Sequence, residues 1–157
     1  MHKITREEFA ERLVGARIKQ RLCKALRFVP EEVTEWDSRD FLVVTDKSGN
    51  EGVLIHQDAI VPFTLSPRAA RTGGRVAAII CDICATWRRG PESAMLTLPK
   101  GDNRSVSYLV CADLDCSLHV RAMTSAGILS RSQIREDITP DRRVERLRER
   151  LTVILAS

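Results

Sequence analysis

Two pairs of cysteines constrain this chain more than any other feature. Two residues separate Cys81 from Cys84, four residues separate Cys111 from Cys116, and residues 85–110 lie between the pairs. A Cys-x-x-Cys turn directs two sulfur atoms toward one point, and a second pair completes a tetrahedron of thiolate ligands. The spacing therefore predicts that the four cysteines bind one Zn2+ ion.

A site with four thiolate ligands has no coordination position left for water, so the predicted zinc is structural rather than catalytic. His119 lies three residues after Cys116 and is an alternative ligand in place of one cysteine. A thioredoxin-like redox role for Cys81 and Cys84 is a further alternative, but the second pair of cysteines argues against it.

Another alternative is an enzyme with an open metal site. With three histidines in the chain, the additional ligands of a metal-dependent nuclease are missing, and His56 at a strand end is more typical of a structural role. We find no serine-nucleophile elbow, no His-Glu-x-x-His motif and no glycine-rich phosphate loop. We therefore predict no enzyme, no catalytic residue and no small-molecule substrate.

Regular periodicity next to the cysteines predicts how they are held. The expected elements are strands at residues 75–80, 93–98 and 105–110, and a helix that starts near Asp115. The second and third strands alternate around a turn and form a hairpin, which ends at Cys111. Cys116 then lies in the first turn of the helix. A knuckle, a hairpin and a helix in this order indicate a treble-clef zinc finger.

The remaining chain completes an α+β fold with an N-terminal helix, a small antiparallel β domain containing the zinc finger, and a C-terminal helix. Residues 1–29 form the expected helical unit and residues 30–157 the zinc-binding unit. The expected elements are a helix at 5–27 that starts with a capping box of Thr5 and Glu8, strands at 41–44 and 52–55, an edge-like strand at 60–65 containing Pro62, a loop at 66–74, an exposed loop at 85–91, a linker at 124–137 and a helix from Pro140.

The charge balance is moderately basic, with 25 Lys and Arg against 21 Asp and Glu. Such a balance favours an acidic partner, either a protein or RNA. The first helix concentrates this charge on a face without acids, which is either a solvated surface or a contact for phosphate or acidic protein. The residues of this face are Arg12, Arg17, Lys19, Arg21, Lys24 and Arg27.

The sequence also predicts the compartment. The charged start of the chain is unlike a secretory signal, and no apolar segment approaches the roughly 20 residues of a membrane span. We therefore expect a cytoplasmic protein, with no membrane partner, whose cysteines are reduced thiolates. The fifth cysteine, Cys23, is expected to be a buried or half-buried residue of the first helix.

Two segments carry a resemblance to a known family. Residues 81–84, Cys-Asp-Ile-Cys, and residues 108–121, which contain Cys-Ala-Asp-Leu-Asp-Cys-Ser-Leu-His-Val-Arg, resemble the C-terminal treble-clef domain of the elongation factor G-binding proteins. These are the FusB-type fusidic-acid-resistance proteins and their relatives, whose domain is called the FBP domain. The resistance proteins carry a helical bundle ahead of this domain, where the present sequence predicts one long helix.

The resemblance implies a non-enzymatic bacterial protein that binds elongation factor G, or the ribosome, through its zinc domain and modulates translation. In the resistance proteins, this binding promotes release of the factor when fusidic acid stalls it on the ribosome. The candidate partner contacts are the loop residues Trp87, Arg88 and Arg89 and the helix residues His119 and Arg121. The alternative is a zinc-finger protein that binds ribosomal RNA or DNA through its basic faces.

Overall fold

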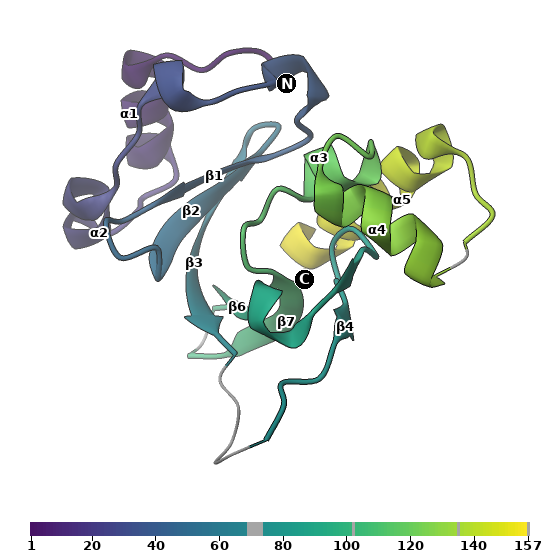
Figure 1. The fold of residues 1–157 in the computed structure, drawn as a ribbon. Coiled ribbons are helices and arrows are strands. Elements are labelled where there is room, and N and C mark those ends of the chain that lie inside the picture. Colours follow the sequence, from purple (N-terminus) through teal and green to yellow (C-terminus); the bar gives the residue numbers. More distant parts are fainter. Residues whose placement is uncertain (69–73, 102, 135, 157) are drawn as a thin grey trace.

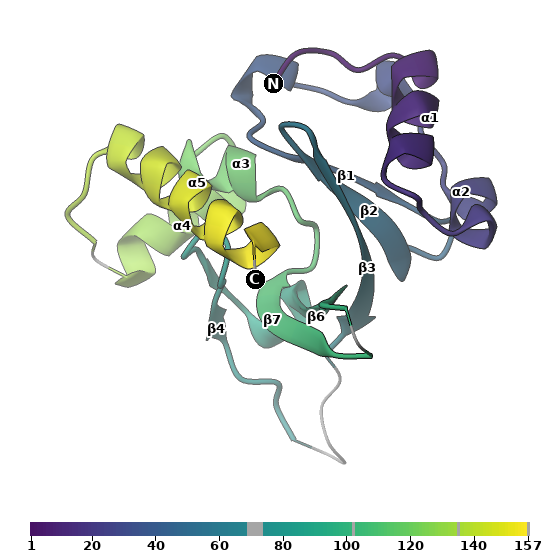
Figure 2. The same cartoon turned by 180° about the vertical axis from the view of Figure 1, so that it is seen from behind.

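The computed structural model describes residues 1–68, 74–101, 103–134 and 136–156. Its centre is an antiparallel sheet, with helices α1 and α2 at one end and helices α3, α4 and α5 at the other (Figure 1). Viewed from behind, α5 lies beside α3 and α4 (Figure 2). The predicted α+β class is confirmed. Residues 69–73 of the expected loop at 66–74 lie outside the described residues.

The main sheet has five strands in the order β1-β2-β3-β6-β7, and every neighbouring pair is antiparallel. Its strands are β1 Leu42–Thr45, β2 Glu51–His56, β3 Ala59–Pro67, β6 Ser93–Pro99 and β7 Ser105–Cys111. The predicted hairpin before Cys111 is confirmed by the pairing of β6 with β7. A separate two-stranded sheet pairs β4 Ile79–Ile80 with β5 Trp87–Arg88, so the strand expected at 75–80 is only two residues long.

The edge-like strand expected around Pro62 is part of the longer strand β3, which lies between β2 and β6 in the sheet order but has one partner at Pro62. This strand pairs with β2 through residues 59–64 and with β6 through residues 64–67. Pro62 lies in the part where only β2 is a partner, so its missing N–H removes no hydrogen bond between β3 and β6. The strand therefore pairs with β2 alone before Thr64 and with β6 alone after it, and it has both partners only at Thr64.

The single helix expected at 5–27 was wrong, because two helices fill this segment. They are α1 Arg6–Gly15 and α2 Gln20–Ala25. The end of α1 is a Schellman motif in which Arg17 has a φ of 53°. The N–H of Arg17 bonds the carbonyl of Val14, and the N–H of Ile18 bonds that of Leu13. The Thr5 hydroxyl caps the start by accepting from the N–H of Glu8.

Three helices follow the last cysteine, α3 Cys116–Val120, α4 Ser125–Ile134 and α5 Pro140–Ala156. Helix α4 occupies the expected linker at 124–137, which is a further correction. Its first turn is capped by the Thr124 hydroxyl, which accepts from the N–H of Gly127 at 3.0 Å. A Cβ atom on Gly127 would lie 2.3 Å from the carbonyl oxygen of His119, so a glycine permits α4 to approach α3. Short 3-10 turns occur at Pro30–Glu32, Trp36–Ser38 and Gly90–Glu92.

Two apolar cores lie on opposite faces of β1 and β2. Side chains alternate between the faces of a strand, so Leu54 faces one core while Val53 and Ile55 face the other. We call the core on the side of the cysteines the zinc-side core and the core under α1 and α2 the N-terminal core. The proposed division of the chain after residue 29 stays a prediction. Within the described residues, no helix is both long and apolar enough to cross a membrane.

Candidate metal centre

The four paired cysteines converge at the end of the sheet. Cys81 and Cys84 bracket the turn between β4 and β5, Cys111 ends β7, and Cys116 begins α3. All four Sγ atoms lie within 4.8 Å of one another, with 3.8 Å between Cys81 and Cys116 and 3.6 Å between Cys84 and Cys111. Tetrahedral ligands at about 2.3 Å from a zinc ion are separated by about 3.8 Å. The cluster therefore has the size of a four-thiolate zinc site.

Two tight turns place these sulfur atoms. In the first, the N–H of Ala85 donates to the carbonyl of Cys81 at 2.9 Å, and in the second, the N–H of Leu114 donates to the carbonyl of Cys111 at 3.1 Å. Ala85 and Leu114 both adopt positive φ angles, 56° and 54°. Each pair of ligands is thus held by a backbone turn that does not depend on the other pair.

Hydrogen bonds join the first turn to the hairpin. The N–H of Asp82 donates to the carbonyl of Leu109 at 2.8 Å, and the N–H of Leu109 donates to the Asp82 carboxylate at 2.6 Å. Arg150 of α5 reaches the carbonyls of Cys81 and Asp82, each at 3.3 Å. The turn is therefore anchored on one side by β7 and on the other by the C-terminal helix.

Each of the four cysteine residues is at most 3% exposed, and none forms a disulfide. Hydrogen bonding to Cys111, Cys81 and Cys84, together with burial, raises the pKa of the Cys116 thiol well above its usual value. Four crowded thiolates cannot share an apolar site without a cation. A divalent ion supplies that charge, so burial and crowding both favour metal binding at this cluster.

An ion-pair network supports the loop between Cys111 and Cys116. The Asp113 carboxylate accepts from Arg88 at 2.9 Å and lies 3.1 Å from Nε2 of His119, while Nδ1 of His119 lies 2.8 Å from the Thr124 hydroxyl. Burial would raise the pKa of Asp113, but its contact with His119 and the charge of Arg88 hold the pKa below its ordinary value. This network connects β5, the ligand loop, α3 and the start of α4.

The prediction that residues 85–91 form an exposed loop was wrong for most of them. Arg88 is 6% exposed, because its guanidinium turns inward to Asp113, while Trp87 is half-buried and Arg89 is exposed. The backbone N–H of Trp87 donates to the Ser130 hydroxyl of α4 at 2.8 Å. His119 is also buried and engaged by Asp113 and Thr124. Its role as an alternative zinc ligand stays a prediction. Cys111, Asp113 and His119 form a second group of side chains that could hold a metal ion.

Arg121 reaches a buried acid that the sequence did not single out. Its guanidinium donates to the Asp40 carboxylate at 2.6 Å, and Arg148 of α5 donates to the same group at 2.8 Å. The N–H of Asp40 donates to the Ser117 hydroxyl, and its carbonyl lies 2.8 Å from Nδ1 of the buried His56. Asp40 therefore ties the segment before β1 to α3 and α5. Partner contacts by Arg88, His119 and Arg121 stay predictions, with these intramolecular roles added.

The family model of the FBP C-terminal treble-clef zinc-finger matches residues 17–157. The chain belongs to this family. The predicted family and the predicted structural Zn2+ ion are thereby confirmed, since the family is a zinc finger and the four buried cysteines fit the ion. Searches of curated proteins and of solved structures gave no significant match.

Proposed function

We propose that this protein is a non-enzymatic, cytoplasmic zinc-binding protein that binds elongation factor G, on or off the ribosome, and modulates translation by promoting release of the factor. The observation that carries the proposal is the family match over residues 17–157, together with the cysteine cluster at its centre. A closed thiolate site has no reactive position. The activity is therefore assigned to a surface that the zinc site holds in place.

The surface that best supports partner binding lies beside the zinc site. Helix α4 packs on β5, and this packing brings the half-buried Trp87 and the exposed Arg89 next to α4. Two apolar side chains of α4 remain accessible, Ile128 at 61% and Leu129 at 37% exposed. Aromatic and arginine side chains beside accessible apolar groups are typical of protein interfaces. Arg89 and Leu129 line one hollow, and Trp87 lies beside it through its bond to Ser130, so we call Trp87, Arg89 and Leu129 the zinc-domain face.

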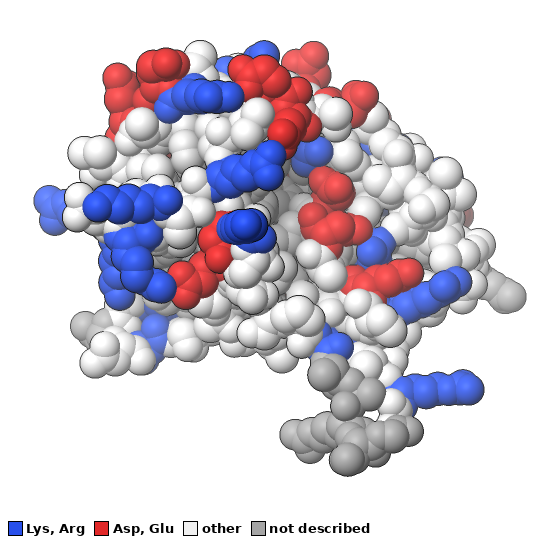
Figure 3. All heavy atoms as spheres, turned by 60° about the vertical axis from the view of Figure 1, so that its left-hand side comes forward, with Lys and Arg blue, Asp and Glu red and all other residues white. Residues whose placement is uncertain are grey.

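Ion pairing within the chain argues for a protein partner over RNA or DNA. Three of the six basic residues of the first helical segment are paired with acids, since Arg12 contacts Glu8, Arg21 contacts Glu51 and Arg27 contacts Glu32. On the side that carries α1 and α2, acidic side chains lie above and among the basic ones, so the basic surface is not continuous (Figure 3). Binding to a phosphate backbone favours clustered, unpaired cations.

The direct test is calorimetric titration of the zinc-loaded protein with purified elongation factor G at low salt. We expect saturable binding that weakens as salt rises, because a rim of charged contacts is screened. The double variant Arg89→Glu with Leu129→Ser is expected to weaken binding by about tenfold or more. Lys47→Glu, an exposed charge change in the turn after β1, is the matched control and is expected to bind like the wild type.

Two outcomes would separate the parts of this proposal. Absence of binding at low salt would refute the assignment of the partner. Binding without faster release of the factor from stalled ribosomes would leave the partner in place and refute the release activity.

A further inference from the structure

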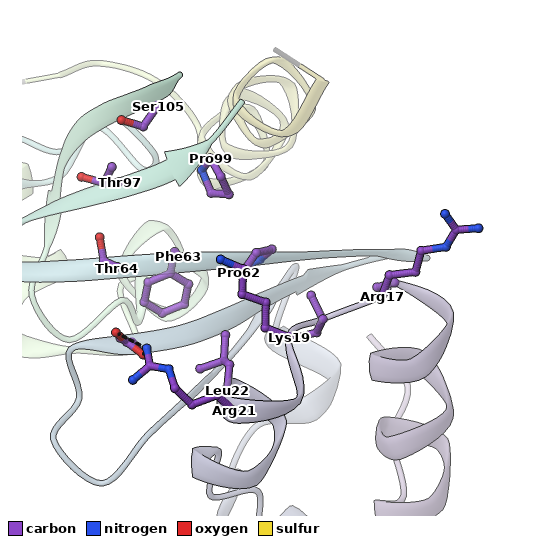
Figure 4. A pocket seen from close by; sticks show the side chains of 13 residues that line it. Arg17, Lys19, Arg21, Leu22, Pro62, Phe63, Thr64, Thr97, Pro99 and Ser105 are labelled. Atoms are coloured by element: carbon purple, nitrogen blue, oxygen red, sulfur yellow. Dashed lines mark hydrogen bonds and ion pairs between the residues drawn. The ribbon is translucent and has the colours of Figure 1, made fainter. Parts of the chain in front are cut away.

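A groove on the other side of the molecule is independent of the zinc-domain face. It has a volume of about 440 Å3 and lies between the corner that joins α1 to α2 and the strands β3 and β6 (Figure 4). Its lining residues come from five parts of the chain, the corner between α1 and α2 and the strands β2, β3, β6 and β7: Ala16, Arg17, Ile18, Lys19, Arg21, Leu22, Glu51, Pro62, Phe63, Thr64, Thr97, Pro99 and Ser105.

Two prolines explain why this groove is open. Strands β3 and β6 pair from Thr64 opposite Thr97 to Pro67 opposite Ala94. Continuing the ladder past Thr64 would bring Pro62 opposite Pro99, and neither residue has an N–H to donate. The strands part at this point, and Figure 4 shows Pro62 on one strand and Pro99 on the next, across the gap. The opening is thus specified by the sequence rather than left by incomplete packing.

The walls of the groove are apolar. Leu22, Pro62, Phe63 and Pro99 contribute carbon surface. The polar side chains opposite them are small hydroxyl groups. A bulky aliphatic or aromatic group would be removed from water there, at a gain of roughly 25 cal/mol per Å2 of buried apolar surface.

The rim of the groove is basic. Among the described residues that line it there are three cations, Arg17, Lys19 and Arg21, and one acid, Glu51, which gives these residues a net charge of +2 (three minus one). Arg21 is paired with Glu51 at 2.7 Å, whereas Arg17 and Lys19 form no ion pair within the described residues. Lys19 extends over the groove beside Pro62, and Arg17 points away at one end (Figure 4). Unpaired cations around an apolar groove favour an occupant that has both apolar and acidic groups.

We infer that this groove binds an acidic peptide segment of a partner protein, with one bulky apolar side chain placed between β3 and β6 and a carboxylate next to Lys19. The half of β3 that has no β6 partner allows an extended segment to lie along the opening. A nucleic acid fits the site less well, because the walls offer one aromatic ring and no row of stacking platforms. The inference does not depend on elongation factor G being a partner.

Fluorescence anisotropy with a labelled peptide tests this site. The probe carries one phenylalanine and one leucine between glutamates, and a matched probe has glutamines in place of the glutamates. We expect the acidic probe to bind the zinc-loaded protein and the neutral probe to bind at least several-fold more weakly. Lys19→Glu is expected to weaken binding of the acidic probe about fivefold, since an attractive exposed pair becomes repulsive. Lys3→Glu, an equal charge change away from the groove, is the control.

A second variant fills the groove without changing its charge. Thr64 is exposed on β3 and lines the groove, so Thr64→Trp is compatible with a strand and occupies the space of the apolar anchor. We expect it to weaken probe binding by about tenfold or more while leaving the melting temperature unchanged. Equal binding to the wild type and to Thr64→Trp would overturn the inference. So would displacement of the peptide by oligouridylate or by laurate at equal concentration, because the occupant would then be a nucleic acid or a lipid.

Discussion

The two faces of strands β1 and β2 are stabilised by different means. On one face, α1 and α2 cover the N-terminal core with ordinary apolar side chains such as Phe9, Leu13 and Leu22. On the other face, the zinc-side core places four cysteines among apolar residues, with Leu147 and Leu151 of α5 against them. Hydrophobic burial is spread over many contacts, whereas a metal site concentrates its contribution in one ion. One sheet therefore separates two cores. Removal of zinc should destabilise mainly the zinc-side core, and loss of an apolar side chain should destabilise mainly the N-terminal core.

The largest effect is expected when the zinc site is broken. Cys116→Ser replaces one thiolate with a weak ligand, and structural zinc contributes about 10–16 kcal/mol to folding in small zinc domains. We expect loss of the bound zinc and a cooperative loss of stability, measured by metal analysis and thermal unfolding. Cys23→Ser changes the half-buried cysteine outside the cluster and should keep one zinc ion per chain. Full zinc occupancy in Cys116→Ser would contradict the four-thiolate site.

The second-largest effect is expected in the N-terminal core, on the opposite face of the sheet. Phe9 is 6% exposed, and its ring centroid lies 4.5 Å from that of Phe28. Phe9→Ala removes this contact and leaves a cavity, so we expect a loss of about 3–4 kcal/mol in the free energy of unfolding, measured with urea. Zinc content should stay at the wild-type value. A joint loss of stability and zinc would show that the two cores are not separable.

Asp40 connects the two regions, and its effect should depend on pH. Its carboxyl side chain is 3% exposed, and burial alone would raise its pKa, but hydrogen bonds and charge from Arg121 and Arg148 hold the pKa below its ordinary value. Asp40→Asn removes the negative charge that Arg121 and Arg148 share, although Arg121 keeps its hydrogen bond to the Ser117 carbonyl, and should cost about 2–3 kcal/mol near neutral pH.

The sign of the pH dependence follows from the lowered pKa. The ionised carboxylate stabilises the fold fully above the unfolded pKa of about 4, and that contribution is lost as the pH falls through the lower folded pKa. The stability difference between the wild type and Asp40→Asn should therefore shrink in acid. A difference that stays constant from neutral to strongly acidic pH would show that the Asp40 charge is not the cause.

The smallest effect concerns the start of α1, at the outer edge of the N-terminal core. The Thr5 hydroxyl accepts from the N–H of Glu8 at 3.1 Å, whereas the Glu8 carboxylate contacts His2 and Arg12 instead of returning to the Thr5 N–H. Only half of the predicted capping box is present. Thr5→Ala should therefore cost about 1 kcal/mol, measured by chemical denaturation, and Thr5→Ser should restore most of it. A loss above about 2 kcal/mol would indicate a role for Thr5 beyond capping.

Patterns local in the sequence were enough to predict the zinc site and the hairpin. The spacing of Cys81, Cys84, Cys111 and Cys116 is itself typical of a metal site. The alternation of apolar and polar residues on both sides of residue 101 predicts the two strands and the turn between them. The split of the first helix also had a local signal, since α1 ends at Gly15, although the left-handed residue is Arg17 rather than a glycine. Gly15 is typical of a helix end, and this signal predicts the break between α1 and α2.

The rest depends on contacts between distant segments. Arg88 is buried because its guanidinium donates a hydrogen bond to Asp113, twenty-five positions later. Arg121 faces inward because it donates to Asp40, eighty-one positions earlier. Helix α4 has little apolar periodicity and is held by Gly127 against α3 and by Ser130 against β5. No pattern within a short stretch of sequence indicates such pairings. The sequence therefore singled out Trp87 and Arg89 of the zinc-domain face, but not the residue of α4 beside them or the groove between β3 and β6.

Hydrogen–deuterium exchange before and after removal of zinc with a chelator tests the central claim most directly. If the zinc site stabilises one core and apolar packing the other, amides of β7 and α3 should lose protection first and by the largest factor. Amides of α1 and β1 should then keep more of theirs. Equal protection of β7 and α3 with and without zinc would contradict the account, because the ion would then hold nothing in place.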